Sequence, residues 1–112
     1  MRHGVLAGAV MLVHAWIGGP AAGDDVRELR LDCWDLYQTC VLGAAGEEIW
    51  RTTCYSDFTA CMRPAGPTSC QRGDRVICNT FRNDCLARAY RNPAMQAQCE
   101  SDMVVCFEAH GC

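Results

Sequence analysis

Apolar side chains and cysteines recur at helical rather than strand spacing along most of this chain. Four stretches carry cysteines at positions i and i+7, and the first also places an apolar residue at i+3, as Cys33, Leu36 and Cys40 show. A step of seven residues is close to two turns of an α-helix, so both cysteines lie on one stripe. The stretches lack the alternation and the β-branched runs that are typical of strands. The pattern therefore predicts an all-α fold.

Cap and turn residues set the expected limits of these helices. Asp24 or Asp25 is expected to cap the first helix, and Pro64 to end the second and open a linker. Asn92 and Pro93 are a helix cap and a proline at the first helical position, so they mark the start of the fourth helix. The expected helices span residues 26–42, 47–63, 74–91 and 93–109.

The cysteine pairs also reveal an internal repeat. Adding 45 to each cysteine number in residues 33–61 gives a cysteine in residues 78–106, so the unit is duplicated. The match extends to Ser56-Asp57 and Ser101-Asp102. We interpret the matching positions as core positions kept by packing. A functional role for the repeated Ser-Asp pair is the alternative.

Large apolar side chains are more numerous than a small disulfide-filled core requires. We expect most of them to be buried and a remainder to form an apolar surface, for which self-association is the simplest explanation. The residues concerned are Trp34, Tyr37, Trp50, Tyr55, Phe58, Phe81, Met103, Val104 and Phe107.

Helical hairpins restrict how the cysteines can pair. A short connection makes two helices antiparallel neighbours, so the first cysteine of one helix faces the last cysteine of the other. Both helices then rise by about 10.5 Å between cysteines, which allows two bonds per hairpin. The expected pairs are Cys33–Cys61, Cys40–Cys54, Cys78–Cys106 and Cys85–Cys99. The crossed pairing, Cys33–Cys54 with Cys40–Cys61, would need parallel helices.

Two cysteines remain outside the hairpins. By elimination Cys70 pairs with Cys112, and this bond would join one hairpin to the other. The alternative is an intermolecular bond in a covalent dimer.

The beginning of the chain differs from the rest. Arg2 and His3 precede an apolar run over residues 5–17, and small residues follow at 21–23. This order is typical of a signal peptide, here residues 1–23, and the run is too short to span a bilayer. All ten cysteines lie in residues 24–112. Such a density predicts a secreted, disulfide-stapled single domain.

Charge is unevenly distributed along the chain. Residues 62–91 hold six arginines and two acidic residues, whereas residues 24–61 and 92–112 are acidic. The net charge of −3 makes nucleic acid an improbable partner. Arginine is suited to carboxylates and aromatic faces, so a contact patch for an acidic partner is one interpretation. The candidate residues are Arg72, Arg75, Arg82, Arg88 and Arg91. The other interpretation pairs them with acids such as Asp32 and Asp35, within the fold or across a homodimer.

Catalytic and metal-binding patterns are missing from residues 24–112 of the sequence. Cysteines seven apart on a helix are about 10 Å apart, too far to share one zinc ion. The one histidine of this range, His110, is expected in a C-terminal loop, with no nucleophile assigned to it. We therefore expect neither an enzyme nor a cofactor.

The whole cysteine frame resembles a known family. Its ten non-adjacent cysteines are separated by 6, 13, 6, 8, 7, 6, 13, 6 and 5 residues. This frame is similar to that of the saposin-like members of the con-ikot-ikot superfamily of cone-snail venom proteins. The resemblance implies a saposin-like helical fold with five disulfides, noncovalent homodimers and modulation of neuronal ion channels. Voltage-gated calcium channels are the favoured target class and glutamate receptors the next.

The leading hypothesis is thus a secreted venom toxin that binds a membrane ion channel from outside the cell, without catalysis. One alternative is a secreted signalling protein, such as a pheromone. Another is a saposin-like lipid-binding protein, although nested disulfides oppose the opening of the hairpins that lipid binding would require.

Overall fold

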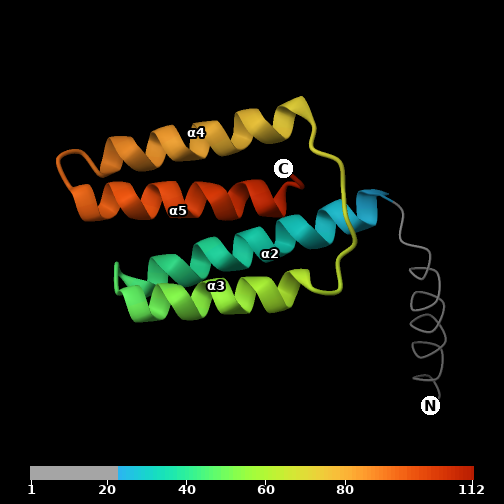
Figure 1. The fold of residues 1–112 in the computed structure, drawn as a ribbon, viewed down its shortest axis with the longest axis horizontal. Helices are drawn as coiled ribbons and strands as arrows, with labels where there is room; N and C mark the ends of the chain where they lie inside the picture. The colour runs from blue at the N-terminus through green and yellow to red at the C-terminus, as the bar shows by residue number, and fades with distance from the viewer. Residues whose placement is uncertain (1–22) are drawn as a thin grey trace, which may run out of the picture.

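Four α-helices in two antiparallel hairpins make up the part of the chain that the computed structural model describes, residues 23–112 (Figure 1). No strand occurs in this range, so the predicted all-α fold is confirmed. The expected signal peptide, apart from Gly23, lies outside the described residues. The helices are α2 (Gly23–Ala44), α3 (Glu48–Met62), α4 (Arg72–Arg88) and α5 (Pro93–Ala109).

Local capping explains where two of the helices begin. α4 begins two residues earlier than expected, because the Asp74 carboxylate accepts a hydrogen bond from the Gln71 backbone N–H at 2.8 Å. α5 begins where Asn92 and Pro93 predict, and the Asn92 side chain accepts from the Met95 N–H at 3.1 Å. Asp24 and Asp25 lie within α2, so neither caps it as expected.

Five disulfides staple the helices, and no cysteine of the described chain is free. Two nested bonds close each hairpin, with Cα–Cα distances of 5.6 and 5.7 Å, which are usual values. The fifth bond, Cys70–Cys112, forms within the chain and connects the linker after α3 to the segment after α5. These are the pairs that antiparallel hairpins predict: Cys33–Cys61, Cys40–Cys54, Cys78–Cys106, Cys85–Cys99 and Cys70–Cys112. A frame with five disulfides is typical of extracellular proteins.

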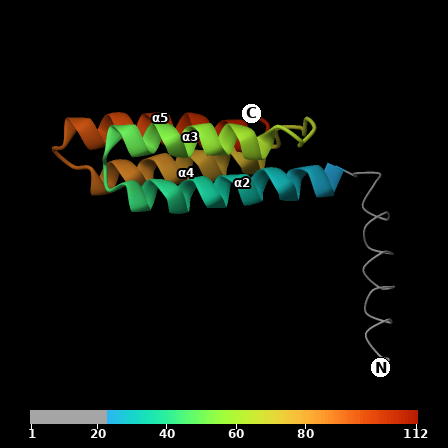
Figure 2. The same ribbon diagram turned by 90° about the horizontal axis from the view of Figure 1, so that it is seen from below.

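The two hairpins pack through their inner helices. In Figure 1 the helices follow the order α4, α5, α2 and α3, and α2 contacts α5. Figure 2 shows α5 and α3 in one layer and α4 and α2 in the other, with both hairpin turns at the same end of the molecule. α3 and α5 therefore run alongside each other on one face, and α2 lies beneath them. This arrangement is compatible with a saposin-like fold.

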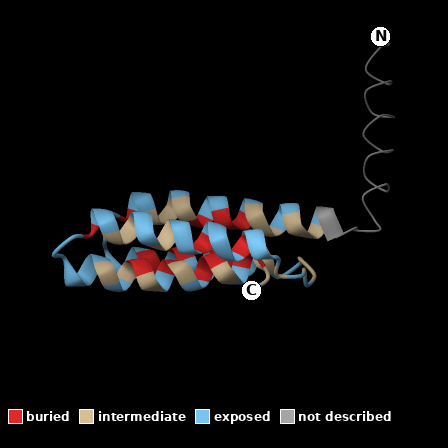
Figure 3. Ribbon diagram, turned by 90° about the horizontal axis from the view of Figure 1, so that it is seen from above, coloured by how far each residue is buried: buried red, intermediate tan, exposed pale blue. Residues whose placement is uncertain are grey.

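The core lies where the four helices face one another, as the red segments of Figure 3 show. Disulfide sulfurs and aromatic rings fill it. Trp34 of α2 meets Phe81 of α4 edge to face, with ring centroids 5.1 Å apart, and Tyr37 meets Phe58 of α3 at 5.7 Å. These ring contacts bring residues of both hairpins into one core.

Most of the large apolar residues are buried or partly buried, as expected. Trp34, Tyr37 and Phe58 are buried. Phe81 and Phe107 pack against them and are partly buried, and Met103 is also partly buried. The exceptions, which are exposed, are Trp50, Tyr55 and Val104. The last two lie beside the groove described next.

Candidate functional site

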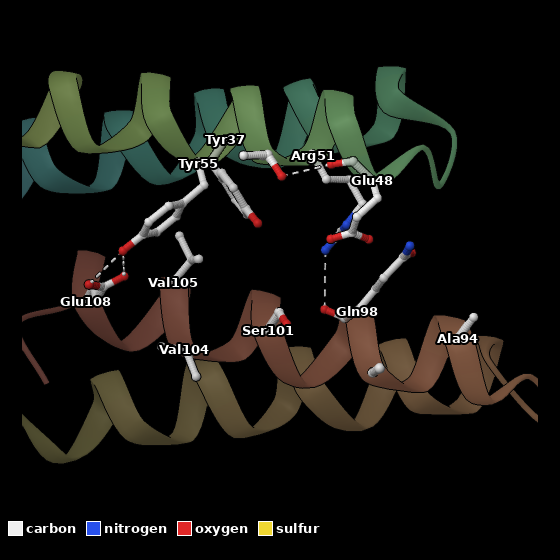
Figure 4. Close-up of a pocket in the computed structure, with 12 residues that line it drawn as sticks. Tyr37, Glu48, Arg51, Tyr55, Ala94, Gln98, Ser101, Val104, Val105 and Glu108 are labelled. Carbon is white, nitrogen blue, oxygen red and sulfur yellow. Dashed lines mark hydrogen bonds between the residues drawn. The ribbon is translucent and has the colours of Figure 1, made fainter.

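A groove of about 610 Å³ separates α3 from α5 on one face of the molecule (Figure 4). α3 and α5 form its walls, and Tyr37 of α2 lies at its base. Half of the lining side chains are small or apolar, and the others are two tyrosines, an arginine, a glutamine and a carboxylate from each wall. The lining residues are Tyr37, Glu48, Arg51, Thr52, Tyr55, Ala94, Ala97, Gln98, Ser101, Val104, Val105 and Glu108.

A buried ion pair at the base of the groove joins three helices. Arg51 of α3 donates to the Asp102 carboxylate of α5 at 2.6 Å, and the Tyr37 hydroxyl donates to the same oxygen at 2.7 Å. Arg51 and Asp102 are only 8% and 6% exposed. Burial, and then the hydrogen bond to the carboxylate, raise the pKa of Tyr37 well above its usual value, so the hydroxyl stays a donor. The cluster fixes the distance between the groove walls.

Carboxylates lie toward the two ends of the groove. Glu48 begins α3, and Glu108 lies in the last turn of α5, at the opposite end in Figure 4. The Tyr55 hydroxyl donates to both oxygens of Glu108, at 3.1 and 3.2 Å. Burial and the neighbouring negative charge raise the pKa of Tyr55. Within residues 23–112, no ion pair engages Glu48 or Glu108.

The repeated Ser-Asp pair turns out to be unequal in its two copies. Asp57 is exposed on α3, whereas the matching Asp102 is buried in the ion pair with Arg51. The sequence does not reveal this difference, because both partners of Asp102 come from the other repeat. The burial of an acidic residue can be predicted from the sequence only when its partner is known.

A second buried cluster lies at the end of the molecule opposite the hairpin turns. His110 lies in the turn after α5, as expected, but as the C-cap of that helix it is only 3% exposed. Its Nδ1 lies 2.8 Å from the Asp74 carboxylate, which also accepts from Arg27 at 2.6 and 2.5 Å. The cluster ties α2 and the end of α5 to the start of α4.

Two cysteine sulfurs lie beside this cluster, but a disulfide removes them as metal ligands. Sulfur atoms of Cys78 and Cys106 lie within 4.8 Å of His110 and of each other. Both sulfurs belong to one disulfide, so neither is available as a thiolate ligand.

The stability of the fold is expected to fall at acid pH because of Asp74. Burial alone would raise its pKa, but hydrogen bonds from His110 and Gln71 and the charge of Arg27 hold the pKa below its usual value. A carboxyl with a lowered folded-state pKa stabilises the protein above its unfolded pKa, near 3.9, and loses that effect as pH falls through the folded pKa. Asp74→Asn should therefore flatten the decline in unfolding free energy below about pH 4.

The control for this experiment is Asp84→Asn, on an exposed site of the same helix. Guanidinium unfolding at several pH values measures the decline in each variant. Identical acid slopes for Asp74→Asn and the unmodified protein would contradict the assignment.

Four of the candidate arginines lie along α4 and Arg91 lies in the turn after it, and none of the five lines the groove. Arg82 forms an ion pair with Glu100 of α5 at 2.7 Å, not with Asp32 or Asp35. The Arg75 side chain lies 3.4 Å from the sulfur of Cys70, and Arg91 stacks over its neighbour Tyr90 at 5.1 Å. The two remaining arginines are exposed near opposite ends of α4: Arg72 and Arg88.

No family model, curated protein or solved structure matches this chain. Among the helices of residues 23–112, none combines the length and the apolar character needed to cross a membrane.

Proposed function

We propose that the protein is a secreted, non-catalytic binding protein that presents the groove between α3 and α5 to an extracellular target. The main support is a groove whose two walls are joined by the buried Arg51–Asp102 pair, while disulfides hold each wall helix to the other helix of its own hairpin. A pocket of several hundred Å³ with few polar groups is a typical binding site. A stapled frame also loses little conformational entropy when it binds.

A neuronal ion channel is the target class that we propose, with voltage-gated calcium channels first and glutamate receptors next. The support is the resemblance of the ten-cysteine frame to saposin-like venom proteins. That resemblance also favours a noncovalent homodimer, for which exposed apolar residues such as Trp50 and Leu42 supply a surface. A signalling role for the secreted protein is the alternative.

Residues 24–112, refolded with all five disulfides, are expected to change depolarisation-evoked calcium signals in dissociated sensory neurons. Ala97→Trp places a large ring in the groove and should abolish the effect, since Ala97 lines the groove and is exposed. Ala87→Trp is the matched control, an exposed alanine of α4 that does not line the groove. Far-UV circular dichroism should be unchanged in both variants.

Other outcomes separate the competing hypotheses. A response lost with Arg72→Ala and Arg75→Ala, but kept with Ala97→Trp, would move the target surface to α4. Efficient leakage of liposomes at low concentration would favour the lipid-binding alternative. An absence of any effect on evoked calcium signals would contradict the ion-channel proposal.

A further inference from the structure

We infer that the groove between α3 and α5 accepts a cationic amphipathic α-helix of the partner. The inference rests on the proposed function, because it concerns the same groove and specifies the chemistry of the ligand. The inference is based on three features of the groove: its shape, the small residues along its α5 wall and the charges of its lining residues.

The shape of the groove matches a helix laid along its length. Lining residues recur every three or four positions on α5, from Ala94 to Glu108, so this wall is one helix face. Fourteen residues of helix correspond to about 21 Å, the length of about four helical turns. Grooves between helices commonly bind an amphipathic helix through apolar side chains at i, i+3, i+4 and i+7.

Small side chains let a guest helix approach the α5 wall closely. Ala94, Ala97 and Ser101 are exposed and lie in succession along the groove. Val104 follows them and is 56% exposed, so it offers an apolar contact that the fold itself leaves uncovered. On the opposite wall, Thr52 and Tyr55 provide a hydroxyl and an aromatic face.

The charges in the groove select a positive ligand. Arg51 is the one cation among the lining residues, and Asp102 neutralises it below the surface. Glu48 and Glu108 therefore leave the groove with a negative charge toward each end. Arg30 is outside the lining of this groove, and its guanidinium donates to the backbone carbonyls of residues 66, 108 and 109. It is also close enough to the Glu108 carboxylate for an electrostatic attraction, so Glu48 is the less compensated of the two acids.

This charge pattern also argues against an anionic lipid as the occupant. A phosphate or fatty-acid carboxylate in the groove would meet two carboxylates and no unpaired cation of the lining. A helix with lysine or arginine near both ends would instead complement Glu48 and Glu108. Complementary charge of this kind raises the association rate and suppresses wrong partners.

The test uses a fluorescein-labelled amphipathic peptide of Leu, Ala and Lys, with its lysines near both ends, and a matched peptide with Glu in place of Lys. Fluorescence anisotropy with residues 24–112 should show saturable binding of the Lys peptide and at least about tenfold weaker binding of the Glu peptide. Glu48→Gln with Glu108→Gln should weaken the Lys peptide by about tenfold or more. Ala97→Trp should abolish its binding.

The matched control is Asp57→Asn with Asp84→Asn, which removes the same charge from exposed sites outside the groove. Equal binding of the Lys peptide by this variant and by the Glu48/Glu108 variant would overturn the inference. So would a failure of the Lys peptide to bind, or preferential binding to vesicles of phosphatidylcholine and phosphatidylserine.

The neuronal assay separates this inference from the proposed function. If the Glu48→Gln, Glu108→Gln variant keeps its full effect on calcium signals, the cationic helix is wrong while the binding role stands. If the unmodified protein binds the Lys peptide but leaves all evoked signals unchanged, the helix inference is supported and the ion-channel proposal fails.

Discussion

Replacing Asp102 with alanine is expected to lower the free energy of unfolding by about 3–5 kcal/mol. The substitution leaves the Arg51 guanidinium buried without its counter-charge and removes the acceptor of the Tyr37 hydroxyl. A buried charge without a partner costs far more than a surface ion pair contributes. Guanidinium unfolding at neutral pH, followed by far-UV circular dichroism with the disulfides intact, measures the loss.

The internal repeat supplies the control for Asp102. Asp57 occupies the matching position of the first unit and is exposed, so Asp57→Ala should change stability by no more than about 0.5 kcal/mol. Arg51→Met combined with Asp102→Leu removes both charges, so it should cost less than the sum of the single changes. Similar losses for Asp57→Ala and Asp102→Ala would show that the buried pair contributes nothing specific.

Removing the disulfide that joins the linker before α4 to the segment after α5, with Cys70→Ser and Cys112→Ser, is expected to cost roughly 3 kcal/mol. The two cysteines are 42 residues apart, but the retained Cys78–Cys106 bond shortens the loop that this cross-link closes to about 15 residues. Each hairpin keeps its own two bonds, so helical content should persist. The near-UV circular dichroism of Trp34 should weaken, because its ring packs against Phe81 of the other hairpin.

The comparison for this change is Cys40→Ser with Cys54→Ser. That bond spans 14 residues within one hairpin, so its loss should cost roughly 3 kcal/mol and leave the Trp34 signal in place. Thermal unfolding and near-UV spectra of both variants measure the difference. An undisturbed Trp34 signal in the Cys70/Cys112 variant would mean that noncovalent contacts alone hold the hairpins together.

The hairpins could be predicted from the sequence because their determinants are local. Cysteines seven apart define a helical stripe, and a short connection between two such stripes leaves one nested pairing. Asn92 and Pro93 likewise specify a helix start, because the Asn92 side chain accepts a hydrogen bond from the backbone N–H of Met95, three residues later. In each case the interacting groups are close in sequence or fixed by the antiparallel geometry.

Contacts between the hairpins could not be predicted in the same way. Asp102 and Arg51 are 51 residues apart, and no spacing rule brings them together. His110 is buried because the end of α5 lies against the start of α4. There its ring forms a hydrogen bond with the Asp74 carboxylate. The groove depends on how the two hairpins pack, which the cysteine spacing leaves open.

Charge segregation was a partial guide to these contacts. It marked α4 as basic, but it could not show that Arg82 pairs with Glu100 across its own hairpin. The binding surface proposed from the structure is instead the acidic side, on α3 and α5. The charge of each segment thus does not map onto one face of the molecule, because the acidic α2 lies in the same layer as the basic α4.

The partners of Asp102, Tyr37 and Arg51, have no equivalents in the second repeat, so the buried cluster distinguishes the two halves of the duplicated chain. Two hairpins with the same cysteine spacing have similar backbones. Exchange of hairpins between molecules, which is domain swapping, is therefore a risk for this chain. At the positions that match Tyr37 and Arg51, the second unit has Arg82 and Gln96. Two copies of the second hairpin therefore cannot rebuild the buried cluster, because they supply Asp102 but no equivalent of Tyr37 or Arg51. Two copies of the first hairpin would still offer Asp57 at the position of Asp102, so the cluster disfavours one of the two like pairings.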